Sequence, residues 1–298
     1  MPYPPPSAPA LPTRRLLLGS LAACALPALT PARAAEPLRV VVSILPQKQF
    51  VERIAGDAAQ VEVLVRPGQS PATCDPTPAQ LVELGRAQLY FRIGTAFEAN
   101  WVPRFQSQFP KLRIVDTREG IELAPMRDAH GQPAASGARD PHIWTSPRLV
   151  KRQAQTVRDA LISLAPAQRE RFEAGYARYA AELDALDAEL RQTLAGKTQR
   201  RFMVFHPAWG YLARDYGLEM IPIEVEGKEP GPKALAALIE QARALGVRVI
   251  FVQRQFSRTA AESVARAIGG EVVELDPLAE DFIAQTRRAA AAIARGMV

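Results

Sequence analysis

The chain has 298 residues, of which 48% are hydrophobic and 23% are charged, with 37 Lys and Arg against 31 Asp and Glu. This length allows two lobes that each bury a core. Three basic residues and no acidic ones lie in the first 34 positions, which leaves 34 basic against 31 acidic residues in the remainder. This small excess, without a basic cluster interleaved with aromatic residues, excludes nucleic acid as a partner.

Residues 1–34 have the pattern of an export signal. Arg14 and Arg15 precede an apolar stretch, and Ala32-Arg33-Ala34 fits a cleavage site. The arginine pair also loosely resembles a twin-arginine signal. No later run approaches the roughly 18 apolar residues of a membrane span. We therefore expect a soluble mature protein in the periplasm.

Cys24 offers a second mode of export. Leu21-Ala22-Ala23-Cys24 resembles a bacterial lipobox, which would anchor a lipoprotein through Cys24. Apolar residues continue beyond it and a cleavage site follows, which favours release of the mature chain. Cys74 is the other of the two cysteines, so a chain that loses Cys24 cannot form an internal disulfide.

Residues 36–163 are expected to form an N-terminal lobe. Apolar and β-branched runs predict strands at 38–45, 61–65, 87–93 and 113–116. A helical pattern lies between the first two strands and ends at Gly56. This alternation predicts an α/β fold with three layers and a mainly parallel sheet. Ligands bind at the carboxyl ends of such strands, which points to the loops after Ile44, Val65 and Ile93.

The loop after Val65 is a candidate binding loop because its prolines stiffen it. A helix is predicted to begin near Thr77, a capping residue before Pro78. The binding-loop candidates are Ser70, Ala72 and Asp75. Cys74 lies two residues after Ala72, so in an extended segment both side chains would point the same way.

Residues 147–196 read as nearly continuous helix. From Phe172 to Leu194, apolar residues recur at steps of three and four. Pro166 suits a first helical position, and Gly196 suits the residue after the last turn. We expect residues 164–196 to form one long helix, about 45 Å in length, that links the lobes. A short coiled coil is the alternative.

Residues 197–298 repeat the αβ pattern and are expected to form a C-terminal lobe. Strands are predicted at 201–205, 219–224, 247–252 and 271–275, and helices at 232–245, 259–268 and 280–295.

The chain has three histidines, and imidazole is the commonest transition-metal ligand in proteins. His142 follows Asp140-Pro141 just before a predicted helix start, and His206 ends a predicted strand. Asp276 follows another strand, before a helix expected near Pro277. The structural alternative is a packed or capping role for His142, a hydrogen-bonded core histidine for His206 and an N-cap for Asp276.

Five segments in order resemble the zinc- and manganese-binding substrate proteins of bacterial ABC importers. They are residues 140–144 (DPHIW), 204–211 (VFHPAWGY), 226–230 (EGKEP), 251–257 (FVQRQFS) and 276–278 (DPL). The resemblance extends from Leu38 to the C-terminus. It implies a monomeric extracytoplasmic protein that captures Zn²⁺, or alternatively Mn²⁺, between two lobes and delivers it to an ABC permease.

The resemblance implies that His142, His206 and Asp276 bind the metal. This sequence differs from the family pattern at Ala72, which stands where the family usually supplies its first metal-binding histidine. Ser70 and Cys74 replace the neighbouring Asp and aromatic residue. A Cys74 thiolate would favour softer ions such as Zn²⁺, although a packed, inert thiol is the interpretation we favour.

Other candidates for the fourth ligand are Asp75, a water molecule and Glu226. Glu226 belongs to a charged turn for which salt bridges at a helix start are the plainer role. His130 lies in a polar loop and is expected to be solvated, with metal delivery as its alternative role.

Two other functions remain as alternatives. A metal-dependent hydrolase would use an open metal position to activate water, but no HExxH, GxSxG or GxxxxGK[ST] motif accompanies the histidines. A family relative with lost or altered metal binding would recognise another small ligand or a partner protein, and Ala72 is the residue that raises this alternative.

Overall fold

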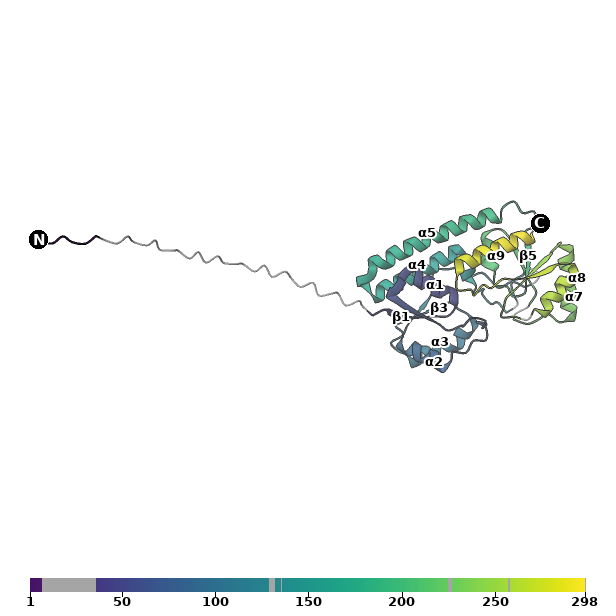
Figure 1. Cartoon of the computed structure of the whole chain (residues 1–298). Coiled ribbons are helices and arrows are strands. Elements are labelled where there is room, and N and C mark those ends of the chain that lie inside the picture. The colour runs from purple at the N-terminus through teal and green to yellow at the C-terminus, as the bar shows by residue number, and fades with distance from the viewer. Residues whose placement is uncertain (7–35, 129–131, 135, 225–226, 257, 298) are drawn as a thin grey trace. The chain divides into compact units, whose positions relative to one another are not determined.

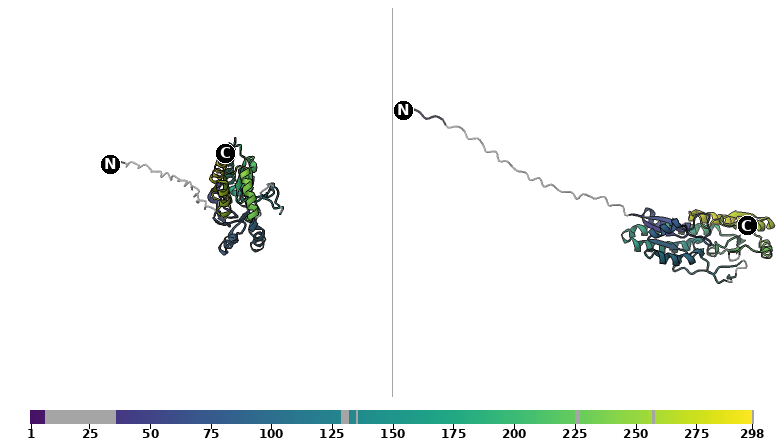
Figure 2. Two further views of the ribbon diagram at one scale, coloured as in Figure 1. Left: turned by 90° about the vertical axis from the view of Figure 1, so that its right-hand side faces the viewer. Right: turned by 90° about the horizontal axis from the view of Figure 1, so that it is seen from below.

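The computed structural model describes residues 1–6, 36–128, 132–134, 136–224, 227–256 and 258–297. Most of the predicted export signal, including Cys24, lies outside the described residues. Glu36–Val298 form one compact unit, in which two sheets lie end to end (Figures 1 and 2). No helix in the described ranges is both long and apolar enough to cross a bilayer.

The first sheet has four parallel strands in the order β2-β1-β3-β4. They are β1 (Leu38–Val42), β2 (Ala59–Val63), β3 (Leu89–Arg92) and β4 (Arg113–Asp116). Val40, Val41 and Val42 are all buried, because helices cover both faces of a parallel sheet. Figure 1 places α2 (Pro78–Arg86) and α3 (Ala96–Gln108) on one side and α1 (Leu45–Ala55) on the other. The three-layer prediction is confirmed.

The linking region is a pair of helices, α4 (Pro147–Leu164) and α5 (Arg169–Thr193), with a 3₁₀ turn, η3 (Pro166–Gln168), between them. The long helix is confirmed as α5. The nearly continuous helix is interrupted at Ala165, because a residue before proline disfavours helical backbone and Pro166 lacks an N–H. The predicted apolar stripe on α5 is buried apart from Tyr176, which is partly buried, and α5 packs against α1 and α4.

The second sheet is also parallel, in the order β6-β5-β7-β8. Its strands are β5 (Arg201–Val204), β6 (Glu219–Pro222), β7 (Val249–Val252) and β8 (Glu271–Glu274). Its helices are α6 (Gly210–Asp215), α7 (Pro232–Ala244), α8 (Thr259–Ile268) and α9 (Phe282–Gly296). Side chains alternate across β5: Phe202 joins the larger apolar core, and Met203 joins a smaller core with α7 and α8.

The closing helix predicted at 280–295 is present as α9, whereas the helix start expected near Pro277 is wrong, since α9 begins at Phe282. Asp281 is its N-cap and accepts a hydrogen bond from the Ala284 N–H at 3.0 Å. Asp276 instead accepts from the Leu278 N–H at 2.9 Å within the connecting turn. The N-cap alternative for Asp276 is therefore wrong, and the side chain borders a loop at the carboxyl end of β8.

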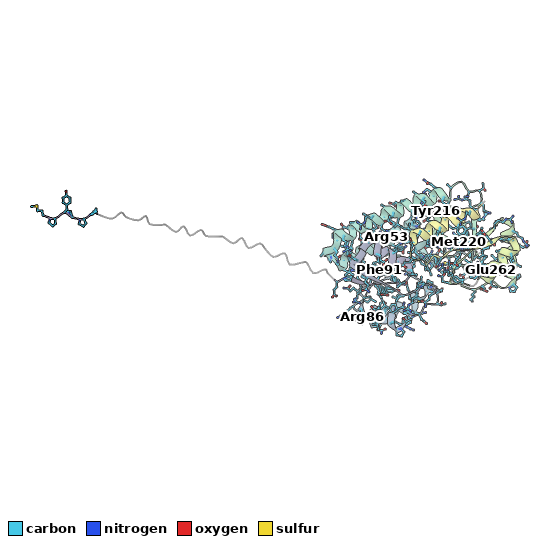
Figure 3. The ribbon with its side chains drawn as sticks, in the orientation of Figure 1. Arg53, Arg86, Phe91, Tyr216, Met220 and Glu262 are labelled. Atoms are coloured by element: carbon cyan, nitrogen blue, oxygen red, sulfur yellow. The ribbon has the colours of Figure 1, made fainter. Side chains whose placement is uncertain are left out.

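A second connection between the lobes comes from α9, which packs along α5. The Phe282 ring meets the Phe50 ring of α1 edge-on at 5.8 Å, and the Phe282 N–H donates to Gln49 Oε1 at 3.1 Å. Phe91 of the first sheet and Met220 of the second, both labelled in Figure 3, belong to or pack against the same apolar core. The two lobes therefore share one core.

Gly175 sets the separation of α5 and α1. A Cβ atom at this position would lie 2.2 Å from the backbone oxygen of Ile54. Replacing glycine by alanine within a helix ordinarily stabilises by about 1 kcal/mol. Here Gly175→Ala should lower the free energy of unfolding by roughly 1–3 kcal/mol, measured by urea denaturation. Glu173→Ala, at an exposed position of the same helix, is the control, and a Gly175→Ala protein more stable than wild type would contradict this packing.

Candidate metal site

His142 and His206 lie next to each other in the lining of a cavity of about 570 Å³. His142 follows β4 and precedes a short turn, η2 (Ile143–Thr145), and His206 follows β5. Their Nε2 atoms are 3.2 Å apart. Two nitrogens bound to one tetrahedral Zn²⁺ at about 2.0–2.1 Å lie roughly 3.3 Å from each other. The spacing therefore suits two ligands of one ion.

A buried carboxylate holds the other nitrogen of each ring. His142 Nδ1 lies 2.7 Å from Asp140 Oδ1, and His206 Nδ1 lies 2.7 Å from Glu224 Oε1. Asp140 is 5% exposed and Glu224 is 3% exposed. Because the carboxylates accept the Nδ1 protons, the lone pairs of both Nε2 atoms are left free to bind a cation.

The surroundings of His206 favour its neutral form. Burial lowers the pKa of this imidazole, while the hydrogen bond to Glu224 raises it and the nearby His142 lowers it again. The net shift is below the ordinary value. Since metals bind the deprotonated nitrogen, this shift favours metal binding at neutral pH.

Aromatic side chains fix the orientation of both imidazoles. Phe256 stacks on His206 with ring centroids 4.8 Å apart and an angle of 22° between the planes. Trp144 packs against His142 at 5.0 Å, and its Nε1–H donates to the Pro277 oxygen at 3.0 Å. The His142 loop is thereby tied to the second lobe, which limits movement between the two histidines.

Asp276 is near the histidine pair but does not join it. Its Oδ1 accepts from Gln255 Nε2 at 3.2 Å, and it borders an adjacent cavity of about 430 Å³. Gln255 and Leu278 line both cavities. Across the described residues, no three His, Cys, Asp or Glu side chains are arranged around one ion position. Two of the three predicted ligands thus lie together, and Asp276 lines the adjacent cavity with its Oδ1 bonded to Gln255.

Some residues of the loop after β2 line the cavity, and others are buried in the core. Ser70 and Ala72 line the cavity, whereas Cys74 is buried and its Sγ–H donates to the Leu64 oxygen at 3.8 Å. The expectation that residues 72 and 74 point the same way is wrong, because a turn joins the Ser70 oxygen to the Thr73 N–H at 3.2 Å.

The side chains of Cys74 and Asp75 form hydrogen bonds outside the cavity. Burial raises the pKa of the Cys74 thiol, with the charge of Asp75 acting in the same direction, so the thiol stays protonated. Asp75 Oδ1 accepts from Trp101 Nε1 at 2.9 Å. These contacts agree with a packed, inert Cys74. His130 and Glu226 lie outside the described residues.

Sequence reasoning missed Glu224, Phe256 and the hydrogen-bonding role of Asp140. Glu224 had a usable signal: it follows β6, which neighbours β5, so its side chain could be expected near His206. Phe256 had no such signal, because its stacking depends on how the loop after β7 folds.

Comparisons with known proteins agree on one family for this chain. The model for ZnuA, the periplasmic component A of a zinc-uptake complex, matches residues 40–296. The high-affinity zinc uptake system protein ZnuA of Bacillus subtilis is 29% identical over 253 residues, covering 82% of this chain and 79% of that protein. The zinc-binding lipoprotein AdcA of Streptococcus pneumoniae is 28% identical over 274 residues, which are 88% of this chain and 54% of AdcA.

Solved structures give the same result. A crystal structure of ZnuA superimposes with a TM-score of 0.83 at 40% identity, covering 88% of this chain and 100% of that one. The laminin-binding protein Lmb of Streptococcus agalactiae, at 20% identity and a TM-score of 0.78, shares the fold.

Glu224→Gln tests the support of His206. The amide can donate an N–H to His206 Nδ1. The ring proton would then lie on Nε2, which could no longer bind a metal. We expect the affinity for Zn²⁺ to fall about 10–100-fold, measured by competition with a zinc-responsive dye. Glu271→Gln, an exposed change on β8, is the matched control. Equal dissociation constants for the two variants would remove Glu224 from this role.

Cys74→Ser tests the packed thiol. Because the side chain lies in the core and not in the cavity, we expect a Zn²⁺ dissociation constant within about twofold of wild type and a loss of about 1 kcal/mol in stability. A large loss of zinc affinity in a folded Cys74→Ser protein would make Cys74 a ligand.

Proposed function

We propose that this chain, which belongs to the ZnuA family of periplasmic zinc-uptake components, captures Zn²⁺ between its two lobes and passes it to the permease of an ABC importer. One observation carries this proposal: the 3.2 Å separation of the two Nε2 atoms, each opposite a carboxylate-bound Nδ1. Two lone pairs at that distance repel each other, and a cation bound by both nitrogens removes the repulsion.

Zn²⁺ is favoured over Mn²⁺ by the donor atoms. Imidazole nitrogen suits zinc, whereas manganese prefers carboxylate, carbonyl and water oxygens and binds more weakly to a given nitrogen site. The names of the relatives agree, since ZnuA of Bacillus subtilis and AdcA of Streptococcus pneumoniae are zinc proteins.

Asp276 is the third ligand that we propose. Its carboxylate would exchange the hydrogen bond from Gln255 for the ion, a movement confined to the turn between β8 and α9. The lobes themselves would move little, since α5 and α9 both join them. Ala72 lies at the cavity without a donor atom in its side chain, so the turn around Ser70 would cover the ion without binding it.

The protein acts outside the cytoplasm in this proposal. We propose a released periplasmic monomer, with a lipid anchor at Cys24 as the alternative. The family serves transport, and we propose no catalytic activity. A hydrolase would need a group that activates water, whereas Asp140 and Glu224 are both occupied by imidazole nitrogens.

His206→Ala tests the proposal directly. Titration calorimetry on chelator-treated wild type should give micromolar or tighter Zn²⁺ binding, and the variant should bind well over about tenfold more weakly, because one of its nitrogen ligands is gone. Gln106→Ala on the exposed face of α3 is a control. If the wild-type protein binds no zinc, the alternative function, recognition of another ligand, is favoured. An unchanged Zn²⁺ dissociation constant in His206→Ala would remove His206 from the site.

A further inference from the structure

Two hydrogen bonds hold the carboxylate of Asp276 through one of its oxygens. Its Oδ1 accepts from the Leu278 N–H at 2.9 Å and from Gln255 Nε2 at 3.2 Å. The first bond lies within the turn that contains Asp276. The second comes from the loop after β7, the strand that pairs with β8. Gln255 therefore holds this carboxylate from a different loop.

The main chain at Asp276 is tied to the loop of His142. The residue before Asp276 continues the hydrogen bonding of β8 with β7. The residue after it, Pro277, has an oxygen that accepts from Trp144 Nε1 at 3.0 Å, and the Trp144 ring packs against His142. Because these contacts hold the main chain, the carboxylate changes its position by rotation of the Asp276 side chain.

Gln255 lies on a loop that is also held in place. The next residue, Phe256, stacks on His206 at 4.8 Å, and its N–H donates to the Gln253 oxygen at 3.2 Å. The Oε1 atom of the Gln255 amide is buried. The loop and the amide therefore have little freedom to follow a rotating Asp276 side chain. A carboxylate that turns toward the ion gives up its hydrogen bond from Gln255.

On the basis of the proposed zinc function, with Asp276 as the third ligand, we propose that Gln255 is a positioning residue that holds Asp276 back from the ion. The ion is then bound by His142, His206 and Asp276, with the fourth tetrahedral position open to water. An amide N–H binds a charged carboxylate more strongly than a neutral acceptor, so Gln255 competes with the ion for Asp276. This competition shortens the time for which Zn²⁺ stays bound, which suits a protein that passes its ion to a permease.

The opposite role would be support of the bound carboxylate. Gln255 would then stay bonded to Oδ1 while the other oxygen of Asp276 binds the ion, as donors behind metal-bound carboxylates do. A supporting bond would leave the carboxylate directed at the imidazoles. The bond to Gln255 is present, yet Asp276 lines the adjacent cavity, and the described side chains form no three-ligand position around one ion. The geometry therefore favours holding back over support.

The rate of zinc dissociation from variant proteins tests this role. Stopped flow with an excess of a chelating dye follows the release of one equivalent of Zn²⁺. Gln255→Leu removes the N–H, and we expect dissociation about tenfold slower than from wild type, whereas Gln106→Leu on the exposed face of α3 should match wild type. Asp276→Ala should bind Zn²⁺ more weakly, and Gln255→Leu added to it should change nothing, because no carboxylate is left to hold back. Gln255→Ala, which also lacks the amide, should repeat the result of Gln255→Leu.

The outcomes separate this inference from the zinc proposal. No zinc bound by wild type would overturn the proposed function itself. Zinc bound by wild type and released as fast or faster by Gln255→Leu and Gln255→Ala would overturn the holding role and leave zinc capture standing. Equal slowing with and without the Asp276 carboxylate would also overturn it, because Gln255 would then act through another group. An Asp276→Ala protein that binds zinc as tightly as wild type would overturn it as well, since Asp276 would not be a ligand.

Discussion

Two hydrogen bonds between imidazole and buried carboxylate determine what this site can do. Asp140 and Glu224 fix the protons of His142 and His206 on Nδ1 and so direct two Nε2 lone pairs toward one position. Without these bonds the rings could rotate or exchange tautomers, and their spacing would carry no information about an ion. The carboxylates are themselves buried, so the hydrogen bonds from the imidazoles also offset part of their lost solvation.

The fold makes this arrangement stiff. His142 lies in a loop whose Asp140 oxygen accepts from the Tyr211 hydroxyl at 2.8 Å, so α6 of the second lobe holds it beside His206. The helices α5 and α9 join the same lobes farther from the cavity, and the close contact at Gly175 leaves α5 little freedom against α1. A ligand site that forms before its ion arrives loses little entropy on binding.

Much of the fold followed from local sequence, because parallel strands and an amphipathic helix have strong periodic signals. His206 was singled out because it ends a predicted strand, and His142 because it lies in a constrained loop before a predicted helix, and the family resemblance marked both as ligands. The additional helix start expected near Pro277 was wrong because Asp276 and Asp281 are both good capping residues, and only packing decides between them. The contacts of Gln255 and Phe256 depend on the tertiary fold of one loop, and spacing along the chain carries no signal for that.

Anomalous diffraction at the zinc absorption edge, from crystals of the zinc-loaded protein, tests the central claim most directly. The account predicts one peak at about 2.0–2.1 Å from the Nε2 atoms of both His142 and His206, with each Nδ1 still bonded to its carboxylate. A zinc peak within bonding distance of only one of these imidazoles, or a zinc peak elsewhere in the molecule, would contradict this account.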